Sequence, residues 1–396
     1  MRPRFCYWSP AANRHLEPFL DEAFRNGALV RVAYLEGNLP AEQQLGTMPA
    51  RRGAQQETVL ATAPDWRRAA VELVRTPCDA HVFYGMGATL EQWSKTAFVM
   101  AACARARVPY VFFGESLQPR ARLELRRIAR DLVYRHVFRS AAGVLAVGAR
   151  AALDFEQLGV ERGRIHAAMY PGPRKTCPYR PPAARRDVVY CGRLLELKGL
   201  DVLADALITL ARRRADVGLV VVGDGPCRAP ISRARAAGVR VMSHGAVPSE
   251  RVPELLGSAS ALALPTARRD GWGYVVNEAL AVGLPVVASD AVGAGELVVP
   301  GRTGEVFRSG DPGALADAIL SALRLHDQAD SLATSFAVAQ RALDPERFTA
   351  YFVSALGAIL TSRAGLWPPW LEAAEELGGN TETRWWRSWR GDAPGS

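Results

Sequence analysis

The chain contains 396 residues, of which 49% are hydrophobic and 22% are charged, and its formal net charge at pH 7 is +9. This length is too great for one ordinary hydrophobic core and suits two domains. No apolar run reaches the ~18–20 residues that a membrane-spanning helix needs. The first residues also lack the apolar segment of a secretory signal, so we expect a cytoplasmic protein.

The positive charge suits three kinds of partner: nucleic acid, an anionic membrane surface or an anionic small substrate. The arginines are spread along the chain and are not interleaved with aromatic residues as in a recognition module, so we expect no nucleic-acid partner. Only three of the cations are lysines, namely Lys95, Lys175 and Lys198. Because lysine is so rare in this chain, a lysine inside a motif is a candidate functional residue.

Six scattered cysteines lack the paired spacing of a metal site. We therefore expect reduced thiols and no bound metal. The cysteines are Cys6, Cys78, Cys103, Cys177, Cys191 and Cys227.

Short β-forming apolar runs alternate with helix-length segments along the chain. In one such segment leucines recur at positions 200, 203, 207 and 210, which is a helical period. This alternation predicts βαβ units and parallel sheets covered by helices on both faces. The expected strands are residues 30–35, 81–84, 109–113, 143–147, 187–191, 218–222, 239–243, 259–264 and 285–289.

A proline-rich stretch, residues 170–182, interrupts this alternation and predicts a linker between two doubly wound domains. We expect domains at residues 1–180 and 181–345, with ligands bound outside the carboxyl ends of the strands, in a cleft between the domains. A closing helix over residues 345–360 and a tail rich in tryptophan and arginine follow. The tail suits a membrane interface or a partner groove; we favour a loosely ordered terminus with a few aromatic side chains packed on the body.

The first domain offers polar and glycine residues after two predicted strands. Gly85 and Gly87 follow one strand, and Glu115 and Ser116 follow another. Glu115 can orient an acceptor hydroxyl or contact a donor sugar, and it can equally cap the next helix. Residues 119–139 form an arginine-rich helix candidate, which either lies on anionic lipid or packs its apolar side on its own domain.

Two motifs in the second domain indicate a phosphorylated sugar as ligand. Gly192, Arg193 and Lys198 follow a strand and precede a helix, an arrangement that suits a diphosphate at the carboxyl edge of a sheet. Ordinary solvated cations on a surface loop are the alternative. A second motif, residues 270–290, has Asp270 in a glycine-bracketed loop and Glu278 eight positions later, and these carboxylates offer acceptors to sugar or ribose hydroxyls.

The strand that ends at Gly223 resembles the start of a dinucleotide fingerprint, but the third glycine is replaced by Arg228. We therefore interpret Gly223 as part of a βα turn that lines a nucleotide site rather than as a nicotinamide motif.

Taken in order along the chain, these motifs resemble the donor half of the family 4 retaining glycosyltransferases, which have the GT-B fold. The resemblance is strong over residues 185–345 and weaker before them. It implies two Rossmann-like domains, the first on the acceptor side and the second binding the donor, with a C-terminal helix that crosses back. The motifs are Gly192-Arg193 with Lys198-Gly199, residues 223–226, Asp270 and Glu278 with the following Gly-Leu-Pro, and Gly295-Glu296 with Gly304.

The resemblance also implies residue roles. Arg193 and Lys198 would hold the donor diphosphate, Asp270 would contact the sugar and Glu278 the ribose. The loop residues Gly271, Gly273, Tyr274 and Val275 would approach the sugar and phosphate through the backbone.

Several residues depart from the commoner family pattern. Asp270 stands where the family usually has Glu, and Trp272 stands where Phe is commoner. Gly114-Glu115-Ser116 stands where many relatives have a histidine, and these last two features are similar to a subset of the family.

The expected function is retaining transfer of a hexose-type sugar, without a metal or other cofactor, from a UDP- or GDP-linked donor to a glycan, glycolipid or small-molecule acceptor. The expected place is the cytoplasm, with peripheral contact at the inner membrane face through residues 119–139. Two rivals remain: a catalytically weak relative that binds a nucleotide sugar, and a nucleotide-sugar epimerase.

Overall fold

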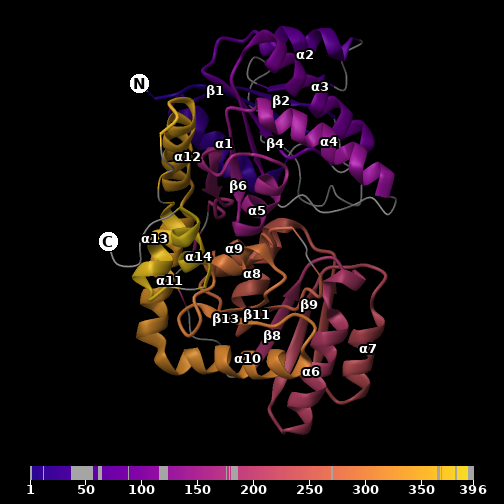
Figure 1. Ribbon diagram of the computed structural model, residues 1–396. Helices are drawn as coiled ribbons and strands as arrows, with labels where there is room; N and C mark the ends of the chain where they lie inside the picture. Colours follow the sequence, from indigo (N-terminus) through magenta and orange to yellow (C-terminus); the bar gives the residue numbers. More distant parts are fainter. Residues whose placement is uncertain are drawn as a thin grey trace. The chain divides into compact units, whose positions relative to one another are not determined.

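The computed structural model describes residues 2–11, 13–36, 57–60, 65–87, 89–115, 124–174, 176–177, 179, 186–268, 271–363, 366, 368–379 and 381–390. The chain divides into two compact units, coloured along the sequence in Figure 1. Unit 1 comprises Met1–Pro171 and Pro345–Pro368, and unit 2 comprises Gly172–Asp344 and Pro369–Ser396.

Unit 1 is built on a parallel seven-stranded sheet of order β3-β2-β1-β4-β5-β6-β7. Every strand pair in it is parallel. The strands are β1 (Phe5–Ser9), β2 (Leu29–Tyr34), β3 (Glu57–Val59), β4 (Ala80–Tyr84), β5 (Tyr110–Gly114), β6 (Gly143–Val147) and β7 (Ile165–Ala168). The helices are α1 (Glu17–Arg25), α2 (Trp66–Val74), α3 (Leu90–Ala106), α4 (Glu124–Ser140), α5 (Ala149–Gln157) and α12 (Pro345–Leu360), with short 3-10 turns at Arg14–Leu16 and Arg162–Arg164.

Neighbouring side chains of β5 point to opposite faces of this sheet, as the pleat requires. Phe112 packs on Phe138 of α4 and Phe155 of α5, whereas Phe113 packs on Phe352 of α12. Helix α12 also packs on α1, and it therefore belongs to unit 1 although it follows unit 2 in the sequence. Helix α12 thus crosses back to unit 1, as the family resemblance implies.

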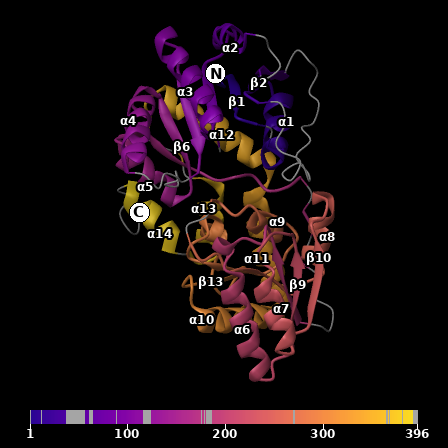
Figure 2. The ribbon, with the colours of Figure 1, turned by 90° about the vertical axis from the view of Figure 1, so that its right-hand side faces the viewer.

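Unit 2 is built on a parallel six-stranded sheet of order β10-β9-β8-β11-β12-β13, and Figure 2 shows its helices from a second direction. The strands are β8 (Arg186–Cys191), β9 (Val217–Val222), β10 (Val241–Gly245), β11 (Ala261–Leu264), β12 (Val286–Ser289) and β13 (Gly304–Phe307). The helices are α6 (Leu200–Arg212), α7 (Ala229–Ala236), α8 (Val252–Gly257), α9 (Val275–Ala281), α10 (Pro312–Arg324), α11 (Ala329–Leu343), α13 (Pro369–Glu376) and α14 (Thr381–Arg390). Four 3-10 turns complete it: η5 (Glu196–Lys198), η6 (Ser249–Arg251), η7 (Gly293–Leu297) and η8 (Leu325–Gln328).

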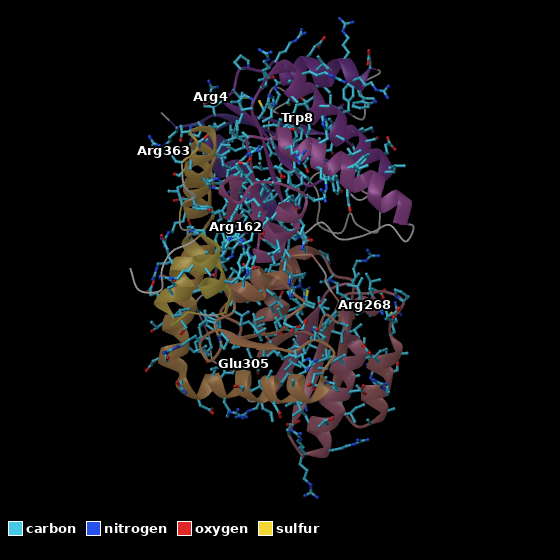
Figure 3. The ribbon with its side chains drawn as sticks, viewed as in Figure 1. Arg4, Trp8, Arg162, Arg268, Glu305 and Arg363 are labelled. Carbon is cyan, nitrogen blue, oxygen red and sulfur yellow. The ribbon has the colours of Figure 1, made fainter. Side chains whose placement is uncertain are left out.

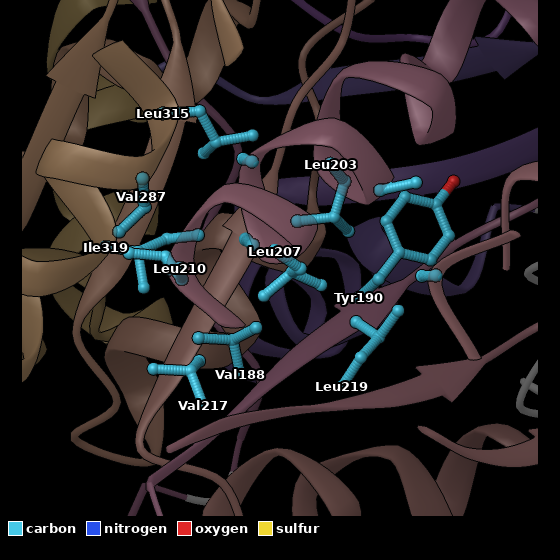
Figure 4. Packing of buried hydrophobic residues seen from close by; sticks show 14 of the residues in the cluster. Val188, Tyr190, Leu203, Leu207, Leu210, Val217, Leu219, Val287, Leu315 and Ile319 are labelled. Atoms are coloured by element: carbon cyan, nitrogen blue, oxygen red, sulfur yellow. The ribbon is translucent and has the colours of Figure 1, made fainter. Parts of the chain in front are cut away.

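The core of unit 2 lies between its sheet and the helices α6 and α10. Leu203, Leu207 and Leu210 of α6 are fully buried against Val188 of β8 and Ile319 of α10 (Figure 4). The leucine period noted in the sequence is therefore the buried face of α6.

The tail forms two helices rather than a loosely ordered terminus. Trp370, Trp386 and Trp389 are buried, and Trp385 stacks on Trp389. The aromatic side chains pack on the body of unit 2, as we expected. Within the described residues, no helix has the length and apolar character that crossing a membrane requires.

Candidate functional site

The strand order of unit 2 reverses at β8: β9 and β10 lie on one side of it, and β11 to β13 lie on the other. In open parallel sheets the loops after two such strands diverge and leave a binding crevice at their carboxyl ends. The loops concerned are residues 192–199 after β8 and 265–274 after β11. The first motif that the sequence indicates lies in the loop after β8, and the described part of the second, from Gly271, begins in the loop after β11 and continues into α9 and β12.

The backbone of the loop after β8 packs directly on the backbone of the loop after β9. Gly223 has a φ of 132°, and a Cβ there would lie 2.0 Å from the carbonyl oxygen of Gly192. The amide of Leu194 donates to the carbonyl of Asp224 at 2.9 Å. A glycine is therefore required at position 223 by close packing, and this supports the interpretation of this strand end as a structural βα turn.

The loop after β8 is joined equally closely to the loop after β11. Gly199, with a φ of 69°, begins α6, and a Cβ there would lie 1.9 Å from the carbonyl oxygen of Pro265. The amide of Ala267 donates to the carbonyl of Leu197 at 2.9 Å. These contacts fix the short turn η5, which ends at Lys198, beside the start of the loop that leads to α9.

Arg193 and Lys198 therefore lie in one anchored loop at the carboxyl edge of the sheet. The side chain of Arg193 is exposed and that of Lys198 is half-buried. Tyr190 fixes the backbone at Arg193, because its hydroxyl donates to the Arg193 carbonyl at 2.8 Å. Within the ranges described above, no carboxylate forms an ion pair with Arg193, so its guanidinium can fork onto two anionic oxygens.

The loop before α9 is held by a buried tryptophan. Trp272, 2% exposed, donates through Nε1 to Oδ1 of Asn277 in α9 at 2.8 Å. Its carbonyl accepts from the amide of Ala294 in η7 at 2.7 Å. Gly271 and Gly273 bracket Trp272, and Tyr274 and Val275 follow as the cap and first residue of α9. The four residues that we expect to contact the ligand through their backbone thus lie together on the turn that leads into α9.

Of the two carboxylates in this motif, the structure describes one. Glu278 is in the first turn of α9 and is buried, with 8% of its surface exposed. Asp270 lies outside the described residues. Arg268, labelled in Figure 3, is the last residue described before it and is exposed.

One residue at the carboxyl edge of the unit 2 sheet, Thr266, belongs to none of the motifs that the sequence indicates. Thr266 is fully buried, and its hydroxyl has no hydrogen-bond partner in the described part of the chain, while its carbonyl accepts from Ser289 at 2.6 Å. A lone threonine after a strand carries no sequence signal of this kind, because its importance depends on burial.

The carboxyl edge of the unit 1 sheet carries a chain of hydrogen bonds that ends at Glu115. Nδ2 of Asn13 donates to the Tyr84 hydroxyl at 2.8 Å, and the Tyr84 and Tyr170 hydroxyls lie 3.0 Å apart. The Tyr170 hydroxyl donates to Oε1 of Glu115 at 2.6 Å. Gly85 and Gly87 directly follow β4 at the same edge, and Ser116 lies outside the described residues.

This chain of bonds has one direction. Each tyrosine hydroxyl has a single proton, and Tyr170 uses its proton for Glu115, so Tyr84 must donate to Tyr170. Burial, with the Glu115 charge as the next cause, raises the pKa of both tyrosines above their usual range. Both therefore remain donors, and they present Glu115 as an oriented, half-buried acceptor.

Comparisons with known proteins bear on the fold of the chain. Residues 185–324 match the family model described as glycosyl transferases group 1. Solved structures cover nearly the whole chain: HepE from Anabaena in complex with UDP has a TM-score of 0.68 at 18% identity, covering 90% of this chain and 100% of HepE. Sucrose-phosphate synthase from Thermosynechococcus elongatus has a TM-score of 0.64 at 17% identity, covering 91% and 100%. The fold is GT-B.

The curated relatives are similar over a shorter stretch. The chain is 34% identical over 220 residues to the GDP-mannose-dependent alpha-(1-6)-phosphatidylinositol monomannoside mannosyltransferase of Mycolicibacterium smegmatis, covering 52% of this chain and 57% of that protein. It is 30% identical over 203 residues to the alpha-D-kanosaminyltransferase of Streptomyces kanamyceticus, covering 47% and 52%. The similarity thus spans a little over half the length of these relatives.

Proposed function

We propose that this GT-B protein transfers a hexose-type sugar from a nucleotide-sugar donor to a hydroxyl of a glycan, glycolipid or small-molecule acceptor, with retention of anomeric configuration. The observation that carries the proposal is the joining of two loops at the strand-order reversal of unit 2. One loop supplies Arg193 and Lys198, and the other leads to the buried Glu278.

The proposed roles follow from the chemistry of these groups. Arg193 and Lys198 hold the donor diphosphate and stabilise the negative charge that grows on it as the sugar leaves. Two fixed cations there replace the divalent ion that other phosphate-transfer sites use, so we propose no metal requirement. Glu278 accepts from the ribose hydroxyls and Asp270 from the donor sugar, while the backbone at Gly271, Gly273, Tyr274 and Val275 approaches the phosphates.

The relatives favour a particular donor to test first. The Mycolicibacterium relative is named as GDP-mannose-dependent, whereas HepE holds UDP but is only 18% identical. We therefore propose GDP-mannose before UDP-glucose. The same relative is named for a phosphatidylinositol mannoside, so a glycolipid is the first acceptor class to test, with Glu115 orienting the acceptor hydroxyl.

A donor panel tests the proposal. We expect GDP- or UDP-sugars to raise the melting temperature with increasing concentration, because a donor that binds only the folded form stabilises it. With a radiolabelled donor and no acceptor, slow release of free sugar is expected.

The same panel separates the two rivals. An epimeric nucleotide sugar as product would identify an epimerase. Tight donor binding with neither hydrolysis nor transfer to any acceptor would identify a catalytically weak relative.

A further inference from the structure

A cluster of two cysteines and a histidine lies in unit 1, away from the residues to which a role in transfer is given above. Cys6 is the second residue of β1 and pairs in register with His81 of β4, while Cys78 lies two residues before the start of β4. Their Sγ and ring nitrogen atoms all lie within 4.8 Å of one another. Cys6 and His81 are buried and Cys78 is half-buried.

The histidine has a fixed tautomer. Trp8, labelled in Figure 3, donates from Nε1 to Nδ1 of His81 at 2.8 Å. An indole nitrogen is only a donor, so Nδ1 of His81 carries no proton and Nε2 must carry it. Nε2 lies 3.1 Å from the carbonyl of Val74 and 3.7 Å from Sγ of Cys78. His81 therefore offers a proton toward Cys78 rather than a lone pair toward a metal ion.

The two thiols are consequently unequal. A hydrogen bond from Cys6 and, to a smaller extent, the hydrogen bond from Nε2–H of His81 lower the pKa of Cys78 to about 5 against the opposing effect of burial. The hydrogen bond with Cys78 and burial raise the pKa of Cys6, which Arg31 of β2 lowers only in part. Cys103 of α3 also faces the pair, and burial raises its pKa. Cys78 is thus the thiolate of the cluster, and it is also the more exposed of the two thiols.

We propose that Cys78 is a peroxide-reactive thiolate and that Cys6 is its resolving thiol, so that the two form a reversible disulfide. The Cys78 thiolate attacks one oxygen of hydrogen peroxide, the O–O bond breaks, and Cys78 becomes a sulfenic acid with release of hydroxide. The sulfur of Cys6 then attacks Sγ of Cys78. The Cys6 proton and the hydroxyl of the sulfenic acid leave as water.

This chemistry is separate from the proposed transferase site. The cluster lies at the amino-terminal ends of β1 and β4, whereas Gly85 and Glu115 lie at the carboxyl edge of the same sheet. Because β1 and β4 are already paired, a disulfide between Cys6 and Cys78 needs no exchange of strand partners. A thiol donor such as reduced glutathione would reverse it.

The first experiment treats the full chain with hydrogen peroxide, alkylates the remaining thiols and maps the peptides by mass spectrometry. We expect a Cys6–Cys78 cross-link with loss of two hydrogen atoms, restored by a reducing thiol. In Cys6→Ser, dimedone should trap a sulfenic acid on Cys78. In Cys78→Ser, Cys6 should stay reduced, and the exposed Cys177→Ser control should form the cross-link normally.

The second experiment compares alkylation rates in the unmodified chain and does not depend on a variant that folds. Between pH 6 and pH 8 the rate at free cysteine, used as the reference thiol, should rise roughly 100-fold with its thiolate fraction. The rate at Cys78 should change less than about threefold, because it is already a thiolate.

Three results would overturn the proposal. The first is a Cys78 alkylation rate that rises with pH in parallel with that of free cysteine. The second is peroxide treatment that leaves Cys78 reduced while Cys177 is oxidised. The third is one equivalent of zinc retained by the native chain and lost in both cysteine variants, which would mean that the cluster holds a metal instead.

Discussion

Glu115 depends on Tyr170 for its position. Tyr170 donates to the carboxylate at 2.6 Å and is itself bonded to Tyr84. A hydrogen bond to a charged group contributes about 1.5–3 kcal/mol, compared with about 0.5–1.5 kcal/mol for a neutral pair. Tyr170 therefore holds the Glu115 carboxylate in one orientation.

Tyr170→Phe tests this contact. We expect it to lower the free energy of unfolding by about 1.5–3 kcal/mol and to raise the KM for the acceptor. Tyr351→Phe is the matched control, because the Tyr351 hydroxyl donates to a neutral carbonyl, that of Ala167, in the same unit. Urea unfolding and acceptor titration measure both effects. Equal losses in the two variants, with acceptor KM unchanged, would contradict the role given to Tyr170.

Gly199 packs the loop of residues 192–199 against Pro265, and replacing Gly199 tests that contact. In Gly199→Ala the added Cβ would lie 1.9 Å from the Pro265 carbonyl oxygen, so the loop must move. We expect a donor Kd at least tenfold weaker and a lower melting temperature. In the control Gly238→Ala, φ is similar at 89° but nothing lies within 4 Å, so only backbone strain of about 1–2 kcal/mol is expected. Equal donor affinity in both variants would show that the contact with Pro265 does not shape the site.

The candidate residues at the carboxyl edge of the unit 2 sheet were more predictable than those at the carboxyl edge of the unit 1 sheet. Gly192, Arg193 and Lys198 lie in one short segment of the sequence, so their grouping follows from the strand and turn that carry them. Glu115 and Tyr170 are 55 positions apart, and only the sheet brings them together. The burial of Thr266 is likewise a property of the fold. The roles assigned to these residues remain proposals.

Among the elements, α14 attaches the C-terminal tail to the turn η7 of unit 2. Trp386, 1% exposed, donates from Nε1 to Oε2 of Glu296 in η7 at 3.3 Å. In the same turn, the amide of Ala294 donates to the carbonyl of Trp272, which lies in the loop before α9. The tail and the donor loop are therefore linked through η7.

Trp386→Ala should destabilise unit 2 by about 3–5 kcal/mol, as expected for the removal of a buried tryptophan, and should weaken donor binding. The control is Ser388→Ala on the same helix, where the side chain is exposed and a change within about 0.5 kcal/mol is expected. Thermal unfolding with and without donor provides both readouts. A Trp386 variant that melts like the Ser388 variant would mean that α14 does not hold η7.

Helix α4 contains the described part, from residue 124, of the arginine-rich segment 119–139, for which two interpretations were open. Its side chains before residue 131 are outside the description, but Leu132 is 62% exposed and Val133 is 36% exposed, and Arg135 and Arg139 are exposed as well. Apolar and cationic side chains exposed together suit an anionic lipid surface, to which each cation near the surface adds about 1 kcal/mol.

Vesicle flotation tests this surface. The chain should bind vesicles rich in phosphatidylserine, bind phosphatidylcholine vesicles weakly and dissociate at high salt. Leu132→Glu should reduce the bound fraction, whereas Leu153→Glu on α5, also exposed, should have little effect. Equal binding to both vesicle types would favour the interpretation of α4 as an ordinary solvated helix.

Most strands were predictable from their apolar pattern, and four were not. The nine expected strands are confirmed within a few residues, as is the helix over residues 345–360. Strands β1, β3, β7 and β13 were missed. β1 was missed although Pro3 and Pro10 flank it, and β3 has only three residues. Such strands form because a neighbouring strand supplies their hydrogen bonds, which a local pattern does not reveal.

At the scale of the whole molecule, two parallel sheets were predictable from the alternation of strands and helices. Each sheet has a reversal of strand order, between β1 and β4 in unit 1 and between β8 and β11 in unit 2. The return of α12 to unit 1 was implied only by the family resemblance. The predicted domain boundaries and the donor and acceptor identities remain proposals, because they depend on surfaces that strand patterns do not encode.

The most direct test of the proposed function is the rate of sugar transfer from GDP-mannose or UDP-glucose by the unmodified chain, Lys198→Ala and Lys95→Ala. Lys95 is the matched control, since it is another of the three lysines and forms an ion pair with Glu91 at 2.6 Å on α3 of unit 1. We predict that Lys198→Ala lowers kcat by roughly 10²–10³-fold, because it removes a cation that stabilises the leaving diphosphate, and that Lys95→Ala keeps the original rate. A folded Lys198 variant that transfers sugar as fast as the unmodified chain would contradict this account.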